Sequence, residues 1–195
     1  MCGIVGYVGM RSAQQVLLDG LEKLEYRGYD SAGVALTQRD GIRVVKSKGR
    51  LSTLRSKLEE LALPQSSCGI GHTRWATHGA PNDVNSHPHV SENGKFAVIH
   101  NGIIENFAQL RAELEATGVT MQSQTDTEVL AHLVNFYLKD DLLEALKKAL
   151  SRVTGAYAVA VFDKRHPERI VGARQGSPMV VGLGEGENFI ASDAM

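Results

Sequence analysis

Short runs of β-branched and aromatic residues, separated by turn residues, predict strands along the first half of the chain. The first run directly follows Cys2, and two later runs flank Arg39-Asp40-Gly41, which is the pattern of a hairpin. The last of them ends on Asn101-Gly102. The runs that predict these strands are GIVGYV, AGVALT, IRVVKSKG, CGIGHTRWAT and KFAVIH.

Leucines and other apolar residues at helical spacing predict helices between and after these strands. The first helix begins with Ser12 and Gln15 in a capping-box pattern and ends at Gly28. Thr125 and Glu128 form a second capping-box pattern, which opens a later helix. The predicted helices cover residues 12–28, 51–63, 103–118 and 125–137, and a further one is centred on Leu146.

The last part of the chain predicts strands again, in the runs AYAVAVFD, RIVGAR, PMVVGL and NFIAS. Most gaps between these runs are too short for a crossover helix, which favours antiparallel pairing. Residues 78–95 predict a long polar loop, and such loops in compact domains are often functional. The pattern as a whole predicts an α+β fold in which helices cover largely antiparallel sheets.

Composition narrows the possible partners and the compartment. The chain has 195 residues, 43% of them hydrophobic, so it predicts a single domain with one substantial core. Lys and Arg number 21 against 22 Asp and Glu, and no basic stripe is present, which argues against nucleic acid and membrane partners. The two cysteines, Cys2 and Cys68, are too few for a disulfide framework. With no signal-peptide or membrane-span pattern, we expect a cytoplasmic protein.

Polar segments interrupt the strand patterns with charges or amides beside glycine, in YRGYDSAG, GHTRWATHG, IHNGIIEN and SQTDTE. Taken singly, each has an ordinary structural explanation. Arg27 would be a cation at a helix C-terminus, Asn101-Gly102 a turn, and Asp126 part of a helix N-terminus. Likewise, Cys2 would be a small apolar core residue and Trp75 a core aromatic in a strand.

Histidines gather in the middle of the chain, at His72, His78, His87 and His89. The spacing gives weak support to a metal site, because no HExxH motif or paired CxxC motif accompanies them. We therefore expect these histidines to make hydrogen bonds and expect no metal and no cofactor.

Read in order, the segments MCGIVG, LEYRGYDSAG, GHTRWATHG, NSHPH, HNGIIEN and SQTDTE resemble the glutaminase domain of class II glutamine amidotransferases. The residues of these motifs are most similar to those of the sugar-phosphate branch, the glucosamine-6-phosphate synthase family. They are less similar to those of asparagine synthetases or the purine-pathway amidotransferases. The resemblance spans nearly the whole chain. It implies the four-layer αββα sandwich of N-terminal-nucleophile hydrolases.

The resemblance also implies a chemistry for the N-terminus. Met1 would be removed, so that the α-amino group of Cys2 serves as the base for its own thiol; these groups ordinarily titrate near pKa 7.7–8.0 and 8.5. The thiolate would attack the side-chain amide of L-glutamine. The side-chain amide of Asn101 and the backbone N–H of Gly102 would form the oxyanion hole. A thioester would then be hydrolysed to glutamate after ammonia leaves.

Glutamine carries both charges at its α-carbon, so a selective site needs a cation and an anion. The resemblance assigns these roles to Arg74 and Asp126. It also implies contacts from Thr77 and His78 to the carboxylate end of the substrate, a place near the nucleophile for Arg27 and Gly28, and a gate to an ammonia channel for Trp75.

The acceptor of the ammonia lies outside what these motifs specify. In the family that the chain resembles, sugar-phosphate isomerase domains follow the glutaminase and use fructose 6-phosphate. The chain shows no phosphate cradle, since its late glycine-rich stretch GLGEGEN carries two glutamates. It also stops soon after a predicted strand, so we interpret residues 1–195 as a glutaminase domain cut at its C-terminal end, without the isomerase domains. Two alternatives remain open: a glutamine-binding domain without turnover, and a class II glutaminase that serves another acceptor.

Overall fold

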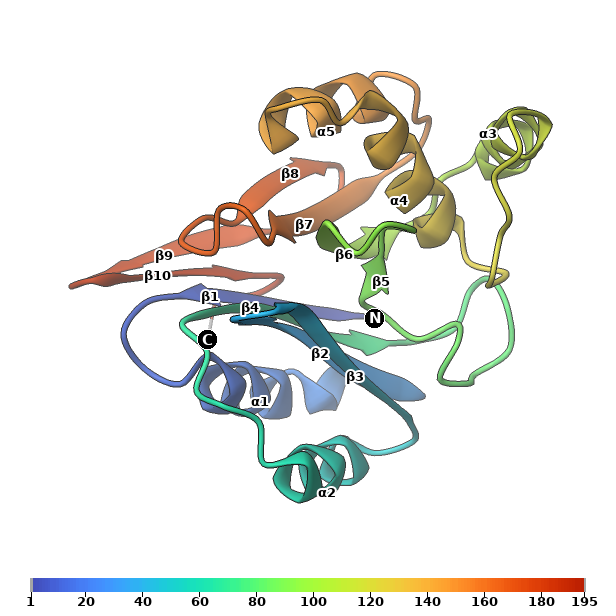
Figure 1. Cartoon of the computed structure of the whole chain (residues 1–195). Coiled ribbons are helices and arrows are strands. Elements are labelled where there is room, and N and C mark those ends of the chain that lie inside the picture. The colour runs from blue at the N-terminus through green and yellow to red at the C-terminus, as the bar shows by residue number, and fades with distance from the viewer. Residues whose placement is uncertain (1, 195) are drawn as a thin grey trace.

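The computed structural model describes residues 2–194, which form two stacked antiparallel sheets with helices on both outer faces (Figure 1). The first sheet has the strand order β3-β2-β4-β1-β10-β9 and the second the order β5-β6-β7-β8. The strands of the first sheet are β1 (Gly3–Val8), β2 (Ser31–Gln38), β3 (Gly41–Lys48), β4 (Cys68–Arg74), β9 (Val180–Gly184) and β10 (Glu187–Ala191). Those of the second are β5 (His89–Val90), β6 (Phe96–Gly102), β7 (Tyr157–Asp163) and β8 (Val171–Gln175).

Helices complete the outer layers. Helices α1 and α2 lie against the first sheet, and α4 and α5 cover the second, while α3 lies to one side of α4 (Figure 1). Their bounds are α1 (Ala13–Lys23), α2 (Leu51–Leu61), α3 (Phe107–Ala116), α4 (Asp126–Tyr137) and α5 (Leu142–Leu150), with a short 3-10 helix η1 (Glu25–Arg27) after α1. The layers therefore follow the order helix, sheet, sheet, helix, as the αββα expectation requires.

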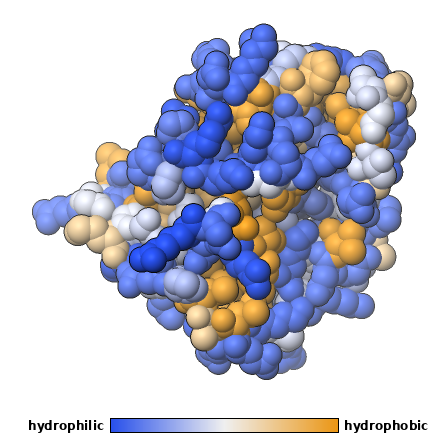
Figure 2. All heavy atoms as spheres, viewed as in Figure 1, coloured by the Kyte–Doolittle hydropathy of each residue, from blue (hydrophilic) through white to orange (hydrophobic). Residues whose placement is uncertain are grey.

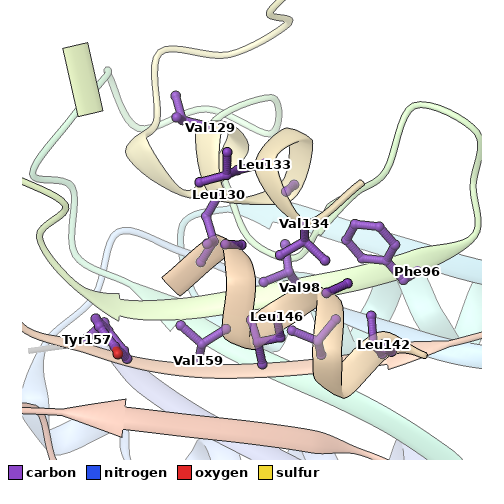
Figure 3. Close-up of a cluster of buried hydrophobic side chains, with 14 of the residues drawn as sticks. Phe96, Val98, Val129, Leu130, Leu133, Val134, Leu142, Leu146, Tyr157 and Val159 are labelled. Atoms are coloured by element: carbon purple, nitrogen blue, oxygen red, sulfur yellow. The ribbon is translucent and has the colours of Figure 1, made fainter. Parts of the chain in front are cut away.

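Three apolar clusters hold these layers together. Small and branched residues fill the space between the sheets, where Ala35 and Ile70 face Ala97, Ala158 and other fully buried residues. A second cluster lies under α1 and α2. The third contains leucines and valines of α4 and α5 together with side chains of β6 and β7 (Figure 3). Burial of each such leucine stabilises the fold by about 1.5–3 kcal/mol relative to exposure.

Local turn chemistry confirms several predicted elements. The hairpin β2–β3 closes with Gln38 opposite Gly41, so that Arg39-Asp40 forms its turn. The Thr125 hydroxyl accepts a hydrogen bond from the Glu128 N–H at 3.2 Å and caps α4. The runs predicted near the C-terminus form β7, β8, β9 and β10, and every strand pair described is antiparallel.

Other predictions were wrong in detail. The Ser12 side chain makes no capping bond, and the Gln15 side-chain amide donates to Asp19 at 2.6 Å. Helix α1 ends at Lys23 rather than at Gly28, where the backbone turns with φ of 76°. The predicted polar loop at 78–95 contains the short strand β5, which pairs with β6.

The segment after β6 also departs from the prediction. A helix predicted from Ile103 begins only at Phe107. The backbone N–H of Ile103 donates to Ala156 O at 3.1 Å, and that of Ile104 donates to the Asp126 carboxylate at 2.9 Å. These bonds hold the segment against β7 and α4, because the N–H groups are committed to partners far along the chain.

The surface seen in Figure 2 is mainly hydrophilic, with apolar atoms visible in patches between the charged side chains. Large exposed apolar side chains include Val181 and Leu183 on the edge strand β9. None of the helices formed by residues 2–194 combines the length and the hydropathy needed to cross a bilayer.

Candidate active site

Strand register brings the polar segments together at one end of the sandwich. Gly3 pairs with Thr73, and Arg74 pairs with Ser31, so the end of β4 lies between the start of β1 and the start of β2. The end of β6 and the N-terminus of α4 face this place from the other layer, and they enclose a cavity of about 450 Å³. Of the predicted site residues, its lining includes Cys2, Arg27, Arg74, Trp75, Thr77, Asn101, Gly102 and Asp126.

The Cys2 thiol lies against the peptide that follows β4. The Trp75 N–H donates a hydrogen bond to Cys2 Sγ at 3.1 Å. Burial raises the pKa of the Cys2 thiol, and the hydrogen bond from Trp75 offsets part of this rise because it favours the thiolate.

Asp30 holds the main chain around Trp75 in place through two hydrogen bonds. Its carboxylate accepts from the Ala76 N–H at 2.6 Å, and its own N–H donates to Arg74 O at 2.7 Å. Asp30 was not predicted as a site residue. The signal available was a carboxylate inside YRGYDSAG, the segment that already contained Arg27.

Asn101 and Gly102 end the strand β6 and do not form the ordinary turn considered from sequence. The Asn101 side-chain NH₂ donates to the Cys2 carbonyl oxygen at 2.9 Å. Gly102 has a φ of 125°, and a Cβ atom there would lie 2.0 Å from the Ala156 carbonyl oxygen. Only glycine fits this position, because any other side chain would collide with β7.

Arg74 and Asp126 place opposite charges on the cavity wall, and both are at least 95% buried. Arg74 Nη2 donates to the carbonyl oxygens of His78 and Gly79, while Nη1 has no hydrogen-bond partner among the described residues. Burial lowers the pKa of Arg74, although a guanidinium stays charged. A buried guanidinium nitrogen without a partner is costly, which suits a site that receives a carboxylate.

Thr77 lines the cavity, but His78 is not among the lining residues. The His78 ring packs edge-on against Phe107, with 4.6 Å between ring centroids. Its backbone carbonyl accepts from Arg74, and its Nδ1 lies 3.4 Å from the Thr77 hydroxyl, so His78 contacts the site through its main chain and through Thr77.

Arg27, Gly28 and Trp75 border the nucleophile on its outer side. Arg27 Nη1 donates to Ser192 Oγ at 2.9 Å and to the Cys2 carbonyl oxygen at 3.4 Å. Trp75 is 54% exposed and lies beyond the end of β4, so the interpretation as a core aromatic was wrong. A Cβ atom on Gly28 would lie 3.3 Å from the Trp75 ring, so this glycine lets the indole approach the backbone.

Buried histidines form a layer next to the cavity. His72, His87, His89 and His100 are all buried, and burial lowers the pKa of each. His87 and His100 line the cavity. Within residues 2–194, no three His, Cys, Asp or Glu side chains are arranged to hold a metal ion. His100 was not predicted as a site residue, although its position at the end of an apolar strand beside Asn101 was an available signal.

Lys46 supports the loop that carries His87. Its ammonium group donates to Ser86 O at 2.7 Å, and burial lowers the pKa of Lys46 to about 8. Nothing in the sequence pattern of β3 distinguished this lysine from a solvent-exposed one.

A family model described as a glutamine amidotransferase domain matches residues 72–194. The glutamine–fructose-6-phosphate aminotransferase (isomerizing) of Thermus thermophilus is 61% identical over 193 residues, which cover 99% of this chain and 32% of that protein. The protein of the same name from Aquifex aeolicus is 54% identical over the same share of both chains. The chain thus spans about a third of the length of the curated relatives it matches.

Solved structures of other proteins share the fold of this chain. The glutamine phosphoribosylpyrophosphate amidotransferase from B. subtilis, complexed with ADP and GMP, has a TM-score of 0.85 and 30% sequence identity. The match covers 98% of this chain and 42% of that one. A glutamine aminotransferase class-II domain protein from Silicibacter pomeroyi has a TM-score of 0.68 at 17% identity, which is a likeness of fold alone.

Proposed function

This chain belongs to the glutamine amidotransferase family, and from that premise we propose that it hydrolyses L-glutamine to glutamate and ammonia with Cys2 as the nucleophile. One observation carries the proposal. The Cys2 thiol shares a cavity with the Asp126 carboxylate and with a buried guanidinium nitrogen of Arg74 that has no hydrogen-bond partner within residues 2–194. Together these groups match glutamine, a zwitterion whose side-chain amide a thiolate can attack.

The first step needs the α-amine of Cys2 to be free, so Met1, which lies outside the described residues, has to be removed. The amine then takes the thiol proton, and Cys2 Sγ attacks the side-chain amide carbon of glutamine. A carbon–sulfur bond forms, and the carbonyl oxygen becomes an oxyanion. When this intermediate collapses, the carbon–nitrogen bond breaks and the ammonium proton passes to the leaving ammonia. Water then hydrolyses the thioester to glutamate and the free thiol.

Asn101 and Gly102 would stabilise the oxyanion. An amide NH₂ group has two hydrogens. The bond to the Cys2 carbonyl uses one of them, which leaves the second to donate to the developing charge. The backbone N–H of Gly102 supplies the second donor, and loss of one such donor typically costs 10²- to 10³-fold in kcat.

The charges of Arg74 and Asp126 on the cavity wall would determine how glutamine is recognised. Arg74 Nη1 binds the α-carboxylate of glutamine, and Asp126 binds the α-ammonium. The carbonyls of His78 and Gly79 fix the orientation of the guanidinium through Nη2. Thr77, which lines the cavity, would contact the carboxylate end of glutamine, and Arg27 and Gly28 would support the nucleophile beside Trp75.

For the whole protein, we propose that residues 1–195 form a glutaminase domain that supplies ammonia to sugar-phosphate isomerase domains. The support is the name and length of the curated relatives, which are about three times longer than this chain. Trp75, exposed at the cavity, would gate the ammonia channel. The acceptor would be fructose 6-phosphate, the compartment the cytoplasm, and neither nucleic acid nor membrane would be a partner. A glutamine-binding domain without turnover would need Arg74 and Asp126, but it would have no use for a thiol held against a backbone N–H donor.

In the test, protein whose loss of Met1 has been verified by intact mass is incubated with glutamine, both in the presence and in the absence of fructose 6-phosphate. We expect glutamate and ammonia in equal amounts and no glucosamine 6-phosphate from this chain alone. Cys2→Ala is the matched control. No glutamate from protein of verified mass would overturn the proposal and favour the binding domain, whereas amino sugar made by this chain would overturn the proposed division into domains.

A further inference from the structure

Behind Asn101, on the side away from Cys2, lies the buried imidazole of His72. His72 Nε2 is 2.8 Å from Asn101 Oδ1 and 3.1 Å from the backbone oxygen of His100. His72 comes from β4 in the first sheet and Asn101 from β6 in the second, so this contact bridges the two sheets. His72 is not among the residues that line the cavity.

The hydrogen-bond partners determine how the Asn101 amide is oriented. The Cys2 carbonyl oxygen only accepts hydrogen bonds, so the group 2.9 Å from it must be the NH₂ of Asn101. The Asn101 oxygen therefore faces His72. Because Asn101 Oδ1 and His100 O are both acceptors, His72 Nε2 must carry the proton.

The proton on His72 Nε2 also determines the tautomer of a second imidazole. His72 Nδ1 lies 3.1 Å from His87 Nδ1, and with its proton on Nε2 the His72 ring can only accept there. His87 Nδ1 then donates. The bonds run in one direction, from His87 to His72, from His72 to Asn101, and from Asn101 to the Cys2 carbonyl.

We propose that His72 is a positioning residue of the oxyanion hole: its Nε2–H holds the Asn101 side chain in the orientation that presents NH₂, rather than oxygen, to the nucleophile. The inference rests on the proposed function of Asn101. An amide oxygen and an amide NH₂ are nearly equal in size, so packing alone would not select between the two orientations. A flipped amide would set two acceptors together at Cys2 and two donors together at His72.

Burial keeps this arrangement intact across the working pH range. It lowers the pKa of His72 to about 3 and the pKa of His87 well below its ordinary value. Both rings therefore stay neutral. A protonated His72 would carry a hydrogen on Nδ1 as well, facing the hydrogen on His87 Nδ1.

The test compares His72→Leu with His72→Gln, whose amide nitrogen can replace Nε2 as the donor. We expect His72→Leu to lower kcat for glutamine hydrolysis about 10²-fold, with KM changed less than about threefold, because the oxyanion forms only after binding. His72→Gln should stay within about tenfold of the wild-type kcat. Thr37→Val is the control: it removes a buried hydroxyl from the same sheet, 2.9 Å from Ser66 Oγ, and should lower Tm while leaving kcat unchanged.

A double mutant shows whether His72 acts through Asn101. In the Asn101→Ala background, His72→Leu should cost no further kcat, because the group that it positions is absent. The same loss in both backgrounds, or wild-type kcat in His72→Leu, would overturn the inference. If Asn101→Ala kept a normal kcat, both the oxyanion role of Asn101 and this inference would be wrong. If Asn101→Ala lowered kcat but His72→Leu did not, only this inference would be wrong.

A spectroscopic readout is independent of activity and of the stability of the variants. Imidazole ¹⁵N chemical shifts of His72 in the wild-type protein should report the neutral Nε2–H tautomer at pH 7. The Nδ1–H tautomer would have no proton to donate to Asn101 and would overturn the inference, even if His72→Leu failed to fold.

Discussion

The strands β1 and β4 pair along their whole length, yet their two ends have opposite chemistry. At one end Val8 lies opposite Cys68, and at the other Gly3 lies opposite Thr73, next to Cys2. Each end therefore carries a thiol. Cys68 is fully buried in the apolar cluster between the sheets, where burial, with a smaller contribution from Glu168, raises its pKa to about 12. Cys2 opens into the cavity and has a backbone N–H donor 3.1 Å from its sulfur.

The difference teaches that the surroundings, rather than the residue type or the strand, distinguish the proposed nucleophile from an inert thiol. A thiolate needs donors, nearby positive charge and access to a substrate. Cys2 has the Trp75 N–H, the cavity and Arg74 on the same wall. Cys68 has apolar neighbours, which disfavour the charged form.

The largest expected effect separates the two cysteines directly. Cys2→Ala should lower glutamine hydrolysis on the order of 10⁴-fold or more with little change in Tm, because it removes the nucleophile from a half-open site. Cys68→Ala should leave kcat unchanged and lower stability by about 1 kcal/mol, or roughly 2–4 °C in Tm. Steady-state kinetics and thermal unfolding on the same samples make the comparison. Turnover in Cys2→Ala would move the nucleophile elsewhere.

The next effect concerns what precedes Cys2 in the chain. Protein that keeps Met1 or a tag should lose about 10²- to 10⁴-fold in kcat, because the proposed base is then an amide nitrogen without a basic lone pair. Thiol titration should still find Cys2 present, and removal of the extension should restore activity. Equal rates for processed and unprocessed protein, each of verified mass, would exclude the α-amine as the essential base.

The wall charges should give a smaller effect, and on KM more than on kcat. Arg74→Gln and Asp126→Asn should each raise KM for glutamine roughly 10- to 100-fold, the equivalent of ~1.5–3 kcal/mol for a hydrogen bond to a charged group. Asn at position 126 retains an oxygen that can accept from the Ile104 N–H, so local structure should persist. Arg152→Ala, which breaks an exposed pair with Glu113, serves as the control and should leave KM unchanged.

A substrate analogue sharpens this assignment. Glutaramate, which lacks the α-ammonium group of glutamine, should react as poorly with the wild type as with Asp126→Asn. A large remaining difference between the two proteins would assign Asp126 to structure rather than to recognition of the ammonium.

The smallest expected effect concerns the carboxylate of Glu128 on α4. Burial alone would raise the pKa of Glu128, but hydrogen bonds from His132, Ser123 and the Gln122 N–H lower it to about 2. The unfolded value is about 4.3, so the stabilisation is fully present above that pH and is lost as the pH falls toward 2. Glu128→Gln should therefore lower Tm at pH 7 and flatten the decline of Tm between pH 5 and pH 2.5.

Glu59→Gln, on the exposed face of α2, is the matched control and should keep the wild-type slope. If Glu128→Gln kept that slope as well, the turn at residues 122–123 would not depend on the charge of Glu128.

The sequence by itself determined the elements whose patterns are strong and local. Turn chemistry at Arg39-Asp40-Gly41 predicted the hairpin β2–β3, and Thr125 with Glu128 predicted the start of α4. Charged residues and amides in otherwise apolar strands marked Arg74 and Asn101, because a core would not select them. The αββα sandwich of the N-terminal-nucleophile hydrolases came from the resemblance of the motifs, and the comparison with solved structures confirms it.

Only the tertiary structure decided which groups meet. Asn101 lies 99 residues from Cys2 and 29 from His72, yet it contacts both, because sheet order and register bring β1, β4 and β6 to one end of the sandwich. Local periodicity carries no information about that register. The direction of the hydrogen bonds from His87 to Cys2 follows from side-chain contacts across layers, and such contacts exist only once the two sheets have packed. The same holds for the guanidinium nitrogen of Arg74 that no described residue pairs with.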